Sequence, residues 1–366
     1  MIETQPHVKA QGIFEKMNEL EHEQVVFCTD KTTGLKAIIA VHNTVLGPSM
    51  GGTRMWHYAT NEEAIEDALR LSRGMTFKSA LAGLNIGGGK AVIIGDARKD
   101  KNEFLMRRFG KFVNSLNGKY YAAEDMNITM QDIEYMNMET PFVAGKPKYM
   151  GGSGDPSPMT AYGVYMGMKA SAKKAYGSDS LEGKNILVQG AGQVGKYLVD
   201  HLMKENANVF IADIFEDKLK AITDKHAGVA VVDPNNLYQM EMDIYAPCAM
   251  GATLNDSTIP ELKCAIIAGA ANNQLAVETR HSAMLSDRSI IYAPDFLINS
   301  GGITNVYHEY LGNHNEDRVK ATTEKIYEVC LNVINHAEVN QIGTHEAALE
   351  LALERIEKVG NVKLGE

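Results

Sequence analysis

The sequence predicts an α/β fold divided into two domains, and three observations support this. First, 366 residues are more than a single hydrophobic core usually holds. Second, short apolar strands alternate with helices beyond about residue 160, which is typical of a doubly wound parallel sheet. Third, "MGGSGDPSP" around Met150 is rich in Gly, Ser and Pro and indicates a linker. We expect domains at residues 1–148 and 149–340, and a C-terminal helix at 341–366 that could pack back on the first domain.

The first domain is predicted to mix strands and helices. "EQVVFCTD" and "LKAIIAVHNT" predict two strands joined by the turn "KTTG", and "LGPSMGGTRMWHY" predicts a glycine-rich loop. Thr60 and Glu63 have the spacing of a capping box, which predicts a helix that continues toward Met75 and Lys78. After it, "KAVIIG" predicts a buried strand, residues 102–116 a helix, and "KYYAAEDMN" another strand.

The second domain is predicted to begin with a helix at Thr160 and to alternate regularly after that. Its predicted strands are "NILVQG", "NVFIAD", "VAVVD", "DIYAPCA", "AIIAGAAN" and "IIYAPDF". Two predicted helices, at residues 317–338 and 344–359, close the chain. We expect the strand ends of this sheet to face a ligand-binding crevice.

Composition and charge argue against several classes of protein. Hydrophobic residues make up 45% and charged residues 22% of the chain, as in ordinary globular proteins. The net charge of −10 argues against a nucleic-acid partner, and no apolar run approaches the roughly 18 residues of a membrane span. The N-terminus does not resemble a signal peptide, and the four cysteines lack the spacing of metal ligands. We therefore expect a cytoplasmic protein with reduced thiols, no metal site and no membrane partner.

The best-placed motif is "NILVQGAGQVGKYLVDHL", in which G-x-G-x-x-G joins a predicted strand to a predicted helix. The first glycine permits a tight turn, the second lets the backbone approach a pyrophosphate, and the third lets helix and strand pack closely. The helix N-terminus then offers free N–H groups to the phosphates. The predicted phosphate-binding residues are Gly190, Ala191, Gly192, Gln193, Val194 and Gly195.

Two further residues indicate which dinucleotide would bind. Asp213 ends the next strand, about twenty residues beyond the glycines, where a carboxylate binds the ribose of NAD and repels the extra phosphate of NADP. Asn272 follows a later strand, where an amide could meet the nicotinamide end. The sequence therefore predicts NAD as cofactor. A glycine-rich turn in an unrelated Rossmann-like fold, and a plain surface acid at Asp213, are the alternatives.

Lys90, in "GLNIGGGKAV", suggests a phosphate-binding lysine. A P-loop requires G-x-x-x-x-G-K-[ST], but Leu84 replaces the first glycine and Ala91 replaces the Ser or Thr. The lysine also precedes a predicted strand rather than a helix, so no helix dipole points at it. A lysine in a glycine-lined, partly dry pocket can instead act as a general base near neutral pH.

Two more charged residues have apolar or small neighbours: Lys78 in "GMTFKSAL" and Asp125 in "AAEDMN". A second lysine that keeps its charge would hold a substrate carboxylate, and a nearby carboxylate could carry protons to and from an amine. Each residue taken singly is more often a solvated surface charge. Their combination with Lys90 and a dinucleotide motif favours a catalytic site.

These residues lie within longer stretches of sequence that resemble a known protein family. "LSRGMTFKSALAGLNIGGGKAV" resembles the signature of the glutamate, leucine, phenylalanine and valine dehydrogenase family. The likeness continues through "LGPSMGGTRMW", "AAEDMNIT", "GGSGDPSPMTAYGV", "GAGQVG", "APCAMGATLN", "AGAANNQL" and "YAPDFLINSGGITNV", in order and over nearly the whole chain. Within the family, the sequence most resembles the members that act on leucine. The resemblance implies an N-terminal α/β substrate domain and a Rossmann-type NAD domain, with a cleft between them.

The resemblance also implies roles for individual residues. Lys90 would activate water for attack on the imino carbon, Lys78 would bind the substrate carboxylate, and Asp125 would handle protons of the amino group. Thr160 and Asn272 would stand near the nicotinamide end of NAD. The substrate site would further comprise Gly51, Gly52, Met75, Met50, Ala123, Ile303 and Val306. The family needs no metal and forms homo-oligomers, which are typically octamers among its leucine-specific members.

The apolar side-chain pocket implied by the resemblance favours an aliphatic substrate. Glutamate-specific members have lysine and serine at the positions of Met50 and Val306, so a glutamate carboxylate here would lie unpaired among apolar groups. Met50 would narrow the pocket against phenylalanine, although methionine is flexible. The sequence does not decide whether L-leucine or L-valine is the preferred substrate, because one methylene changes specificity by only about 1–3 kcal/mol. Met50 and Ile303 occupy positions where the leucine-specific members usually have a leucine and a valine residue. These two differences leave open which length of substrate side chain is preferred.

We expect NAD-dependent, reversible oxidative deamination of L-leucine and other branched-chain L-amino acids to 2-oxo acids and ammonium. One alternative is an enzyme of the same family with valine or phenylalanine as its best substrate. The others are an NAD-binding protein without catalysis and an unrelated Rossmann dehydrogenase of a hydroxy acid. The joint presence of Lys78, Lys90 and Asp125 argues against a protein without catalysis.

Overall fold

The computed structural model describes residues 12–312 and 314–364 and confirms the α/β class. Contacts between Cα atoms divide the chain into two compact units. The first is the chain up to Thr76 together with Ile86–Val143, and the second is Phe77–Asn85 together with the chain from Ala144 onward. The division falls within one helix and assigns Lys78 to the second unit. The functional domain bounds 1–148, 149–340 and 341–366 stay predictions.

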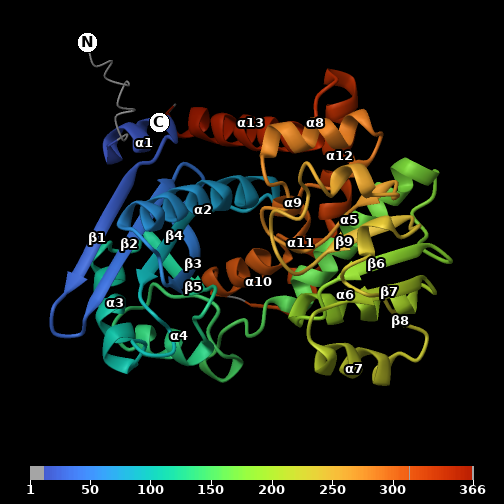
Figure 1. The fold of residues 1–366 in the computed structure, drawn as a ribbon. Coiled ribbons are helices and arrows are strands. Elements are labelled where there is room, and N and C mark those ends of the chain that lie inside the picture. The colour runs from blue at the N-terminus through green and yellow to red at the C-terminus, as the bar shows by residue number, and fades with distance from the viewer. Residues whose placement is uncertain (1–11, 313, 365–366) are drawn as a thin grey trace, which may run out of the picture. The chain divides into compact units, whose positions relative to one another are not determined.

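The first unit is a five-stranded mixed sheet with helices on both faces (Figure 1). The strand order is β1-β2-β4-β3-β5, in which β2 pairs antiparallel with β1 and β4, and β3 pairs in parallel with β4 and β5. The β1–β2 pair confirms the hairpin predicted at "KTTG". The elements are α1 (Ile13–Glu19), β1 (Gln24–Asp30), β2 (Leu35–Asn43), β3 (Ser49–Trp56), α2 (Asn61–Leu81), β4 (Gly87–Ile94), α3 (Glu103–Ser115), β5 (Tyr120–Glu124) and α4 (Met130–Asn137).

The two faces of this sheet bury different helices. On one face, α3 packs an apolar stripe that includes Leu105, Phe109 and Val113 against the strands and α4. On the other face, α2 packs small side chains, among them Ala64 and Ala68. Alternate residues of β2 enter the two clusters, as the period of two in a strand requires. The small residues of α2 allow this helix to lie close to the sheet.

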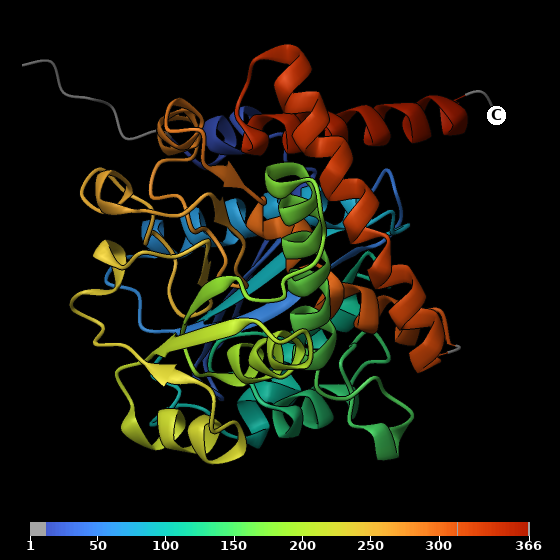
Figure 2. The same cartoon turned by 90° about the vertical axis from the view of Figure 1, so that its right-hand side faces the viewer.

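The second unit contains a six-stranded parallel sheet in the order β11-β10-β9-β6-β7-β8. The order of strands along the chain reverses between β6 and β9, which confirms the predicted doubly wound sheet. Such sheets bind ligands beyond the carboxyl ends of the strands at this switch point. In the turned view of Figure 2, where the strands β6–β8 are yellow-green to yellow, helices α5 and α12 run side by side.

The elements of the second unit, beyond the end of α2, are as follows: the 3₁₀ turn η1 (Lys148–Met150), α5 (Ser157–Tyr176), β6 (Asn185–Gln189), α6 (Gln193–Lys204), β7 (Asn208–Ala212), α7 (Glu216–Lys225), β8 (Ala230–Val231), η2 (Leu237–Gln239), β9 (Ile244–Pro247), η3 (Ile259–Glu261), β10 (Ile266–Ile267), α8 (Glu278–Asp287), β11 (Ile291–Tyr292), α9 (Asp295–Ile298), α10 (Gly301–Tyr310), α11 (Glu316–Glu324), α12 (Ile326–Asn340) and α13 (Thr344–Leu364).

The structure corrects three predictions about these elements. "LGPSMGGTRMWHY" is not a loop, because Ser49–Trp56 forms β3 between β4 and β5, where pairing on both sides outweighs the weak strand propensity of glycine. Lys90 does not precede a strand but lies inside β4. The helix predicted at 317–338 is two helices, α11 and α12, which meet at Lys325.

The closing helix α13 contacts α8, α12 and β11 within the second unit. Arg355 of this helix also donates hydrogen bonds to the carbonyl oxygen of Leu84 and to Oδ1 of Asn85, in the segment that follows α2. Across residues 12–312 and 314–364, we find no helix that combines the length and the apolar character needed to cross a membrane.

Candidate active site

Three adjacent parallel strands of the first unit carry the predicted catalytic residues. Lys90 lies on β4, Gly51 and Gly52 lie on β3 in the middle, and Asp125 directly follows β5. In the register of β3 and β5, Gly52 is opposite Ala123. The sheet therefore brings together residues that are far apart in the sequence.

The glycines around Lys90 are required by the close approach of other protein atoms. A Cβ on Gly88 would lie 2.2 Å from both the amide nitrogen and Oγ1 of Thr76 on α2. A Cβ on Gly89 would lie 2.7 Å from the ring of Tyr120, and one on Gly51 would lie 1.7 Å from the carbonyl oxygen of Gly89. These glycines thus let α2 and β5 close onto the strands. That they also make room for a substrate stays a prediction.

Lys90 and Asp125 form an ion pair, with 2.6 Å between Nζ and Oδ2, and their side chains are 7% and 25% exposed. Arg54 of β3 donates from Nε to the same carboxylate oxygen at 3.0 Å. Burial acts to raise the pKa of Asp125, but the charges of Lys90 and Arg54 outweigh it and hold this pKa at about 2. A carboxylate that stays ionised at neutral pH therefore lies directly beside a buried lysine.

The predicted substrate-pocket residues differ in exposure. Met50 on β3 is fully buried, Ala123 on β5 is buried, and Met75 on α2 is partly buried. In the second unit, α10 carries Val306, which is buried, and Ile303, which is partly buried. Their role in lining a substrate pocket stays a prediction.

The glycine motif follows β6 and has the local geometry that its spacing predicts. Gly190 has φ of +113°, a conformation that L side chains rarely adopt. A Cβ on Gly195 would lie 1.9 Å from the carbonyl oxygen of Gly190, whereas one on Gly192 would meet nothing within 4 Å. Gly192 is the N-cap of α6, so open space lies at a helix N-terminus that no side chain of the cap residue covers.

Asp213, directly after β7, lies against this loop. Its Oδ2 accepts a hydrogen bond from the amide of Ala191 at 2.7 Å, and its Oδ1 accepts one from the amide of Phe215 at 3.0 Å. The open space at Gly192, the helix N-terminus and the adjacent carboxylate together suit a dinucleotide. Gln193 and Val194 form the first turn of α6 beside them.

Lys78 and Asn272 lie together in the second unit. Nζ of Lys78 donates to Oδ1 of Asn272 at 3.2 Å, and Nδ2 of Asn299 donates to the same oxygen at 2.8 Å. Thr160, near the start of α5, packs against the start of α10, since a Cβ on Gly302 would lie 2.6 Å from its Oγ1. The residue predicted to bind the substrate carboxylate thus contacts one predicted to stand near the nicotinamide.

Sequence reasoning missed Arg54 and its second partner, Asp67 of α2. Nη1 of Arg54 lies 2.9 Å from Oδ2 of Asp67, which also accepts a hydrogen bond from the hydroxyl of Tyr58 at 2.6 Å. Arg54 is recognisable in "GGTR" as a cation next to two glycines. Its partners come from a helix and from the end of another strand, so no local pattern identifies them. Asn299 was missed for the same reason.

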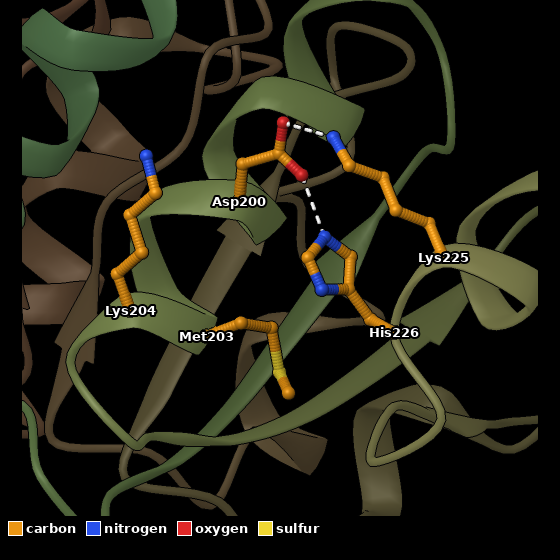
Figure 3. Close-up of a pocket in the computed structure, with 5 residues that line it drawn as sticks. All are labelled: Asp200, Met203, Lys204, Lys225 and His226. Carbon is orange, nitrogen blue, oxygen red and sulfur yellow. Dashed lines mark hydrogen bonds and ion pairs between the residues drawn. The ribbon is translucent and has the colours of Figure 1, made fainter.

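A pocket of about 340 Å³ is lined by residues of α6 and of the end of α7, which Figure 3 shows. Within it, Asp200 of α6 pairs with Lys225 at 2.7 Å and with His226 at 2.6 Å. The other lining residues, Met203 and Lys204, belong to the C-terminal end of α6, whereas the glycine motif lies at its N-terminal end. The pocket is therefore separate from the glycine motif, and a dinucleotide site at that motif stays a prediction. In the described part of the chain, we find no group of His, Cys, Asp or Glu side chains suited to a metal ion.

Comparison with known proteins decides the family. Residues 22–142 match a model described as the Glu/Leu/Phe/Val dehydrogenase dimerisation domain, and residues 151–215 and 211–363 match one described as Glutamate/Leucine/Phenylalanine/Valine dehydrogenase. The chain belongs to this dehydrogenase family. Membership confirms the expected two-domain fold and the expectation of an amino-acid dehydrogenase. It also argues against an unrelated dehydrogenase of a hydroxy acid.

Three relatives show the range of this dehydrogenase family. The chain is 51% identical to a leucine dehydrogenase of Bacillus cereus over 349 residues, which are 95% of this chain and 94% of that protein. It is 46% identical to a phenylalanine dehydrogenase of Thermoactinomyces intermedius over 352 residues, 96% of each chain. Among solved structures, L-tryptophan dehydrogenase from Nostoc punctiforme is 43% identical with a TM-score of 0.83, covering 95% of this chain and 99% of that one.

Proposed function

We propose that the chain catalyses NAD-dependent, reversible oxidative deamination of L-leucine and other branched-chain L-amino acids to 2-oxo acids and ammonium. The observation that carries the reaction type is the ion pair between buried Lys90 and Asp125, beside the glycines of β3 and β4. The substrate class is supported by 51% identity to a leucine dehydrogenase, against 46% to a phenylalanine dehydrogenase.

The proposed roles follow from where protons must move. Nζ of Lys90, once it has released its proton, takes one from the water that attacks the imino carbon. Asp125 exchanges protons with the amino group of the substrate, which suits a carboxylate that is ionised at neutral pH. Lys78 keeps its charge and binds the substrate carboxylate. The backbone of Gly51 and Gly52 lines the site for this carboxylate.

The residues proposed to hold NAD surround the carboxyl ends of β6 and β7. Residues 190–195 and the N-terminus of α6 receive the pyrophosphate, and Asp213 receives the ribose. Thr160 and Asn272 lie toward the nicotinamide. When bound, NAD accepts the hydride from the substrate Cα. The acid at Asp213 favours NAD over NADP, because it repels an added phosphate.

The apolar character of Met50 and Val306 supports an aliphatic substrate. Both side chains are buried, so a glutamate side chain placed against them would leave a carboxylate without a partner. Ala123 and Ile303 add to the same apolar lining in the proposal. Valine is the nearest competing substrate, since it lacks one methylene of leucine.

Substitution of Lys90 tests the proposed function. Lys90→Ala is expected to lower the rate of NADH formation from L-leucine and NAD by about 100- to 10,000-fold, the usual contribution of a general base. NAD binding, followed by fluorescence titration, should be unchanged. Lys101→Ala is a matched control, because Lys101 also forms a partly buried ion pair, with Asp132, in the same unit. Near-full turnover by Lys90→Ala, with NAD still bound, would contradict the mechanism.

The proposal includes a homo-octamer and a cytoplasmic location. The octamer is supported by the family resemblance, and an oligomer is also consistent with the description of the first matched model as a dimerisation domain. The cytoplasmic location is supported by the four cysteines, which lack the spacing of metal ligands and are all free. Light scattering coupled to size-exclusion chromatography tests the assembly, with eight copies of the 40.1 kDa chain as the expected result. A monomer would contradict it.

A further inference from the structure

Four charged side chains of the first unit form a row of alternating sign: Lys90, Asp125, Arg54 and Asp67. Asp125 lies between the two cations, with its Oδ2 2.6 Å from Nζ of Lys90 and 3.0 Å from Nε of Arg54. Arg54 in turn lies between two carboxylates, because its Nη1 is 2.9 Å from Oδ2 of Asp67. The residues come from β4, the end of β5, β3 and α2, so four elements meet in this row.

The row is shielded from water along its length. The side chains of Arg54 and Asp67 are 19% and 15% exposed, comparable to the 25% of Asp125. Charges in such surroundings are screened less by salt than surface charges, so each of them affects its neighbours more strongly. The row therefore differs from a surface ion pair, whose removal usually changes little.

Arg54 matters most when Lys90 gives up its proton. With all four groups ionised, the two positive and two negative charges balance. If Lys90 becomes neutral, Asp125 loses one of its two cations, and a shielded carboxylate without a cation is strongly disfavoured. Arg54 keeps its charge at any pH that the enzyme meets, so Asp125 stays paired in both protonation states of Lys90. Both cations contact Oδ2 of Asp125, at 3.0 Å for Arg54 and 2.6 Å for Lys90.

We propose that Arg54 and Asp67 form an electrostatic clamp that keeps Asp125 ionised and oriented while Lys90 releases its proton, and that the clamp sets the pH range of the reaction. This inference rests on the proposed function. Arg54 acts through Asp125 and is a positioning residue. Asp67 partly offsets the positive charge of Arg54 and holds its guanidinium group in place.

Other titratable groups also face the clamp. Tyr58 donates to Asp67, Arg70 lies 3.6 Å from the other oxygen of Asp67, and Asp125 influences Tyr120. Burial raises the pKa of both Tyr58 and Tyr120 well above that of a free tyrosine, so both stay neutral over the assay range. The charge of the clamp near neutral pH is therefore set by Arg54 and Asp67, with Arg70 at its outer end.

The two members of the clamp should have opposite effects on the pH profile of kcat/KM for L-leucine. Arg54→Gln removes a positive charge, which makes proton release harder, so the rise of kcat/KM should move to higher pH by about one unit or more. Asp67→Asn removes a negative charge, which strengthens the positive field of Arg54, so the rise should move to lower pH. Arg54→Lys keeps the charge but cannot reach both carboxylates, and its profile should lie closer to that of the parent than the Arg54→Gln profile does.

Arg107→Gln is the matched control, since Arg107 pairs with Glu139 in the same unit and does not contact the clamp. It should keep the parent profile. Turnover of L-leucine by the parent protein is measured first, and its absence would count against the proposed function. With an active parent, unshifted profiles in Arg54→Gln and Asp67→Asn, or shifts in the same direction, would overturn the clamp. If Arg54→Gln does not fold, an Asp67→Asn profile that is unshifted or moved to higher pH overturns it alone.

Discussion

Gly192 and Gly195 occupy the same loop but meet different surroundings. A Cβ on Gly195 would collide with the carbonyl oxygen of Gly190 at 1.9 Å, whereas one on Gly192 would point into open space. Gly192 also has ordinary extended backbone angles, φ −73° and ψ −167°, that alanine can adopt. Gly195 is therefore required for close packing, whereas we propose that Gly192 leaves room for a ligand.

Alanine substitutions should separate these two purposes. Gly195→Ala is expected to destabilise the fold by about 1–3 kcal/mol, the usual range for overpacking, and to lower Tm. Gly192→Ala should leave Tm unchanged and raise the KM for NAD, because its methyl group occupies space proposed for the pyrophosphate. Thermal unfolding and steady-state kinetics measure both. A lowered Tm with unchanged KM in Gly192→Ala would show that its role is structural.

At the scale of elements, β4 and α2 can lie close together because glycines stand where they meet. Gly88 and Gly89 lie against Thr76 of α2 and Tyr120 of β5, and the hydroxyl of Tyr120 donates to the carbonyl oxygen of Gly51 at 2.8 Å. The strand that carries Lys90 is thus fixed by neighbours on both sides. These contacts would hold Lys90 in place for the proton transfer that we propose for it.

A pair of glycine substitutions tests this packing. Gly89→Ala would place a methyl group 2.7 Å from the ring of Tyr120 and should destabilise the protein by about 1–3 kcal/mol. Gly74→Ala, on α2, meets nothing within 4 Å and should stabilise it by about 0.5–1 kcal/mol, since alanine favours a helix. Chemical denaturation measures both changes. Equal stability of the two variants would contradict the packing argument.

The elements that the sequence predicts well are those with local signals. The hairpin at "KTTG", the helix after Thr60 and the glycine loop after β6 are confirmed, because each depends on residues close together in the chain. Strand β3 was missed since its two glycines suggest a loop, and only pairing with β4 and β5 makes it a strand. The contacts of Arg54 with Asp67 and Asp125 depend on the same pairing, so they required the structure.

At the scale of the whole molecule, stability should depend on pH through two buried histidines. Burial lowers the pKa of His22 to about 4, and burial together with neighbouring His22 lowers that of His42 to about 3. His42 bridges β2 to Thr76 of α2 at 2.8 Å and to the carbonyl oxygen of Leu20 at 2.9 Å. Because both pKa values lie below that of an unfolded histidine, their contribution is fully present above about pH 6.5 and declines as the pH falls toward 4 and 3.

Replacing His42 should therefore reduce the sensitivity of the fold to acid. When a histidine titrates normally in the unfolded state but stays neutral in the folded state, the free energy of unfolding is about 2 kcal/mol lower at pH 5 than at pH 8. The fall in Tm from pH 8 to pH 5, measured by calorimetry, should be smaller in His42→Gln than in the parent. The exposed His57 provides a control, since His57→Gln should retain the parent's fall. An unchanged fall in His42→Gln would contradict the assignment.

Substrate preference is the property of the whole enzyme that most directly tests the proposed function. The decisive measurement is kcat/KM with NAD for L-leucine, L-valine, L-phenylalanine and L-glutamate. We predict the highest value for L-leucine, a value about tenfold or more lower for L-phenylalanine, and one at least about 1,000-fold lower for L-glutamate, whose carboxylate finds no partner. A higher value for L-phenylalanine or L-glutamate than for L-leucine, or no NADH formation with any of the four, would contradict the account.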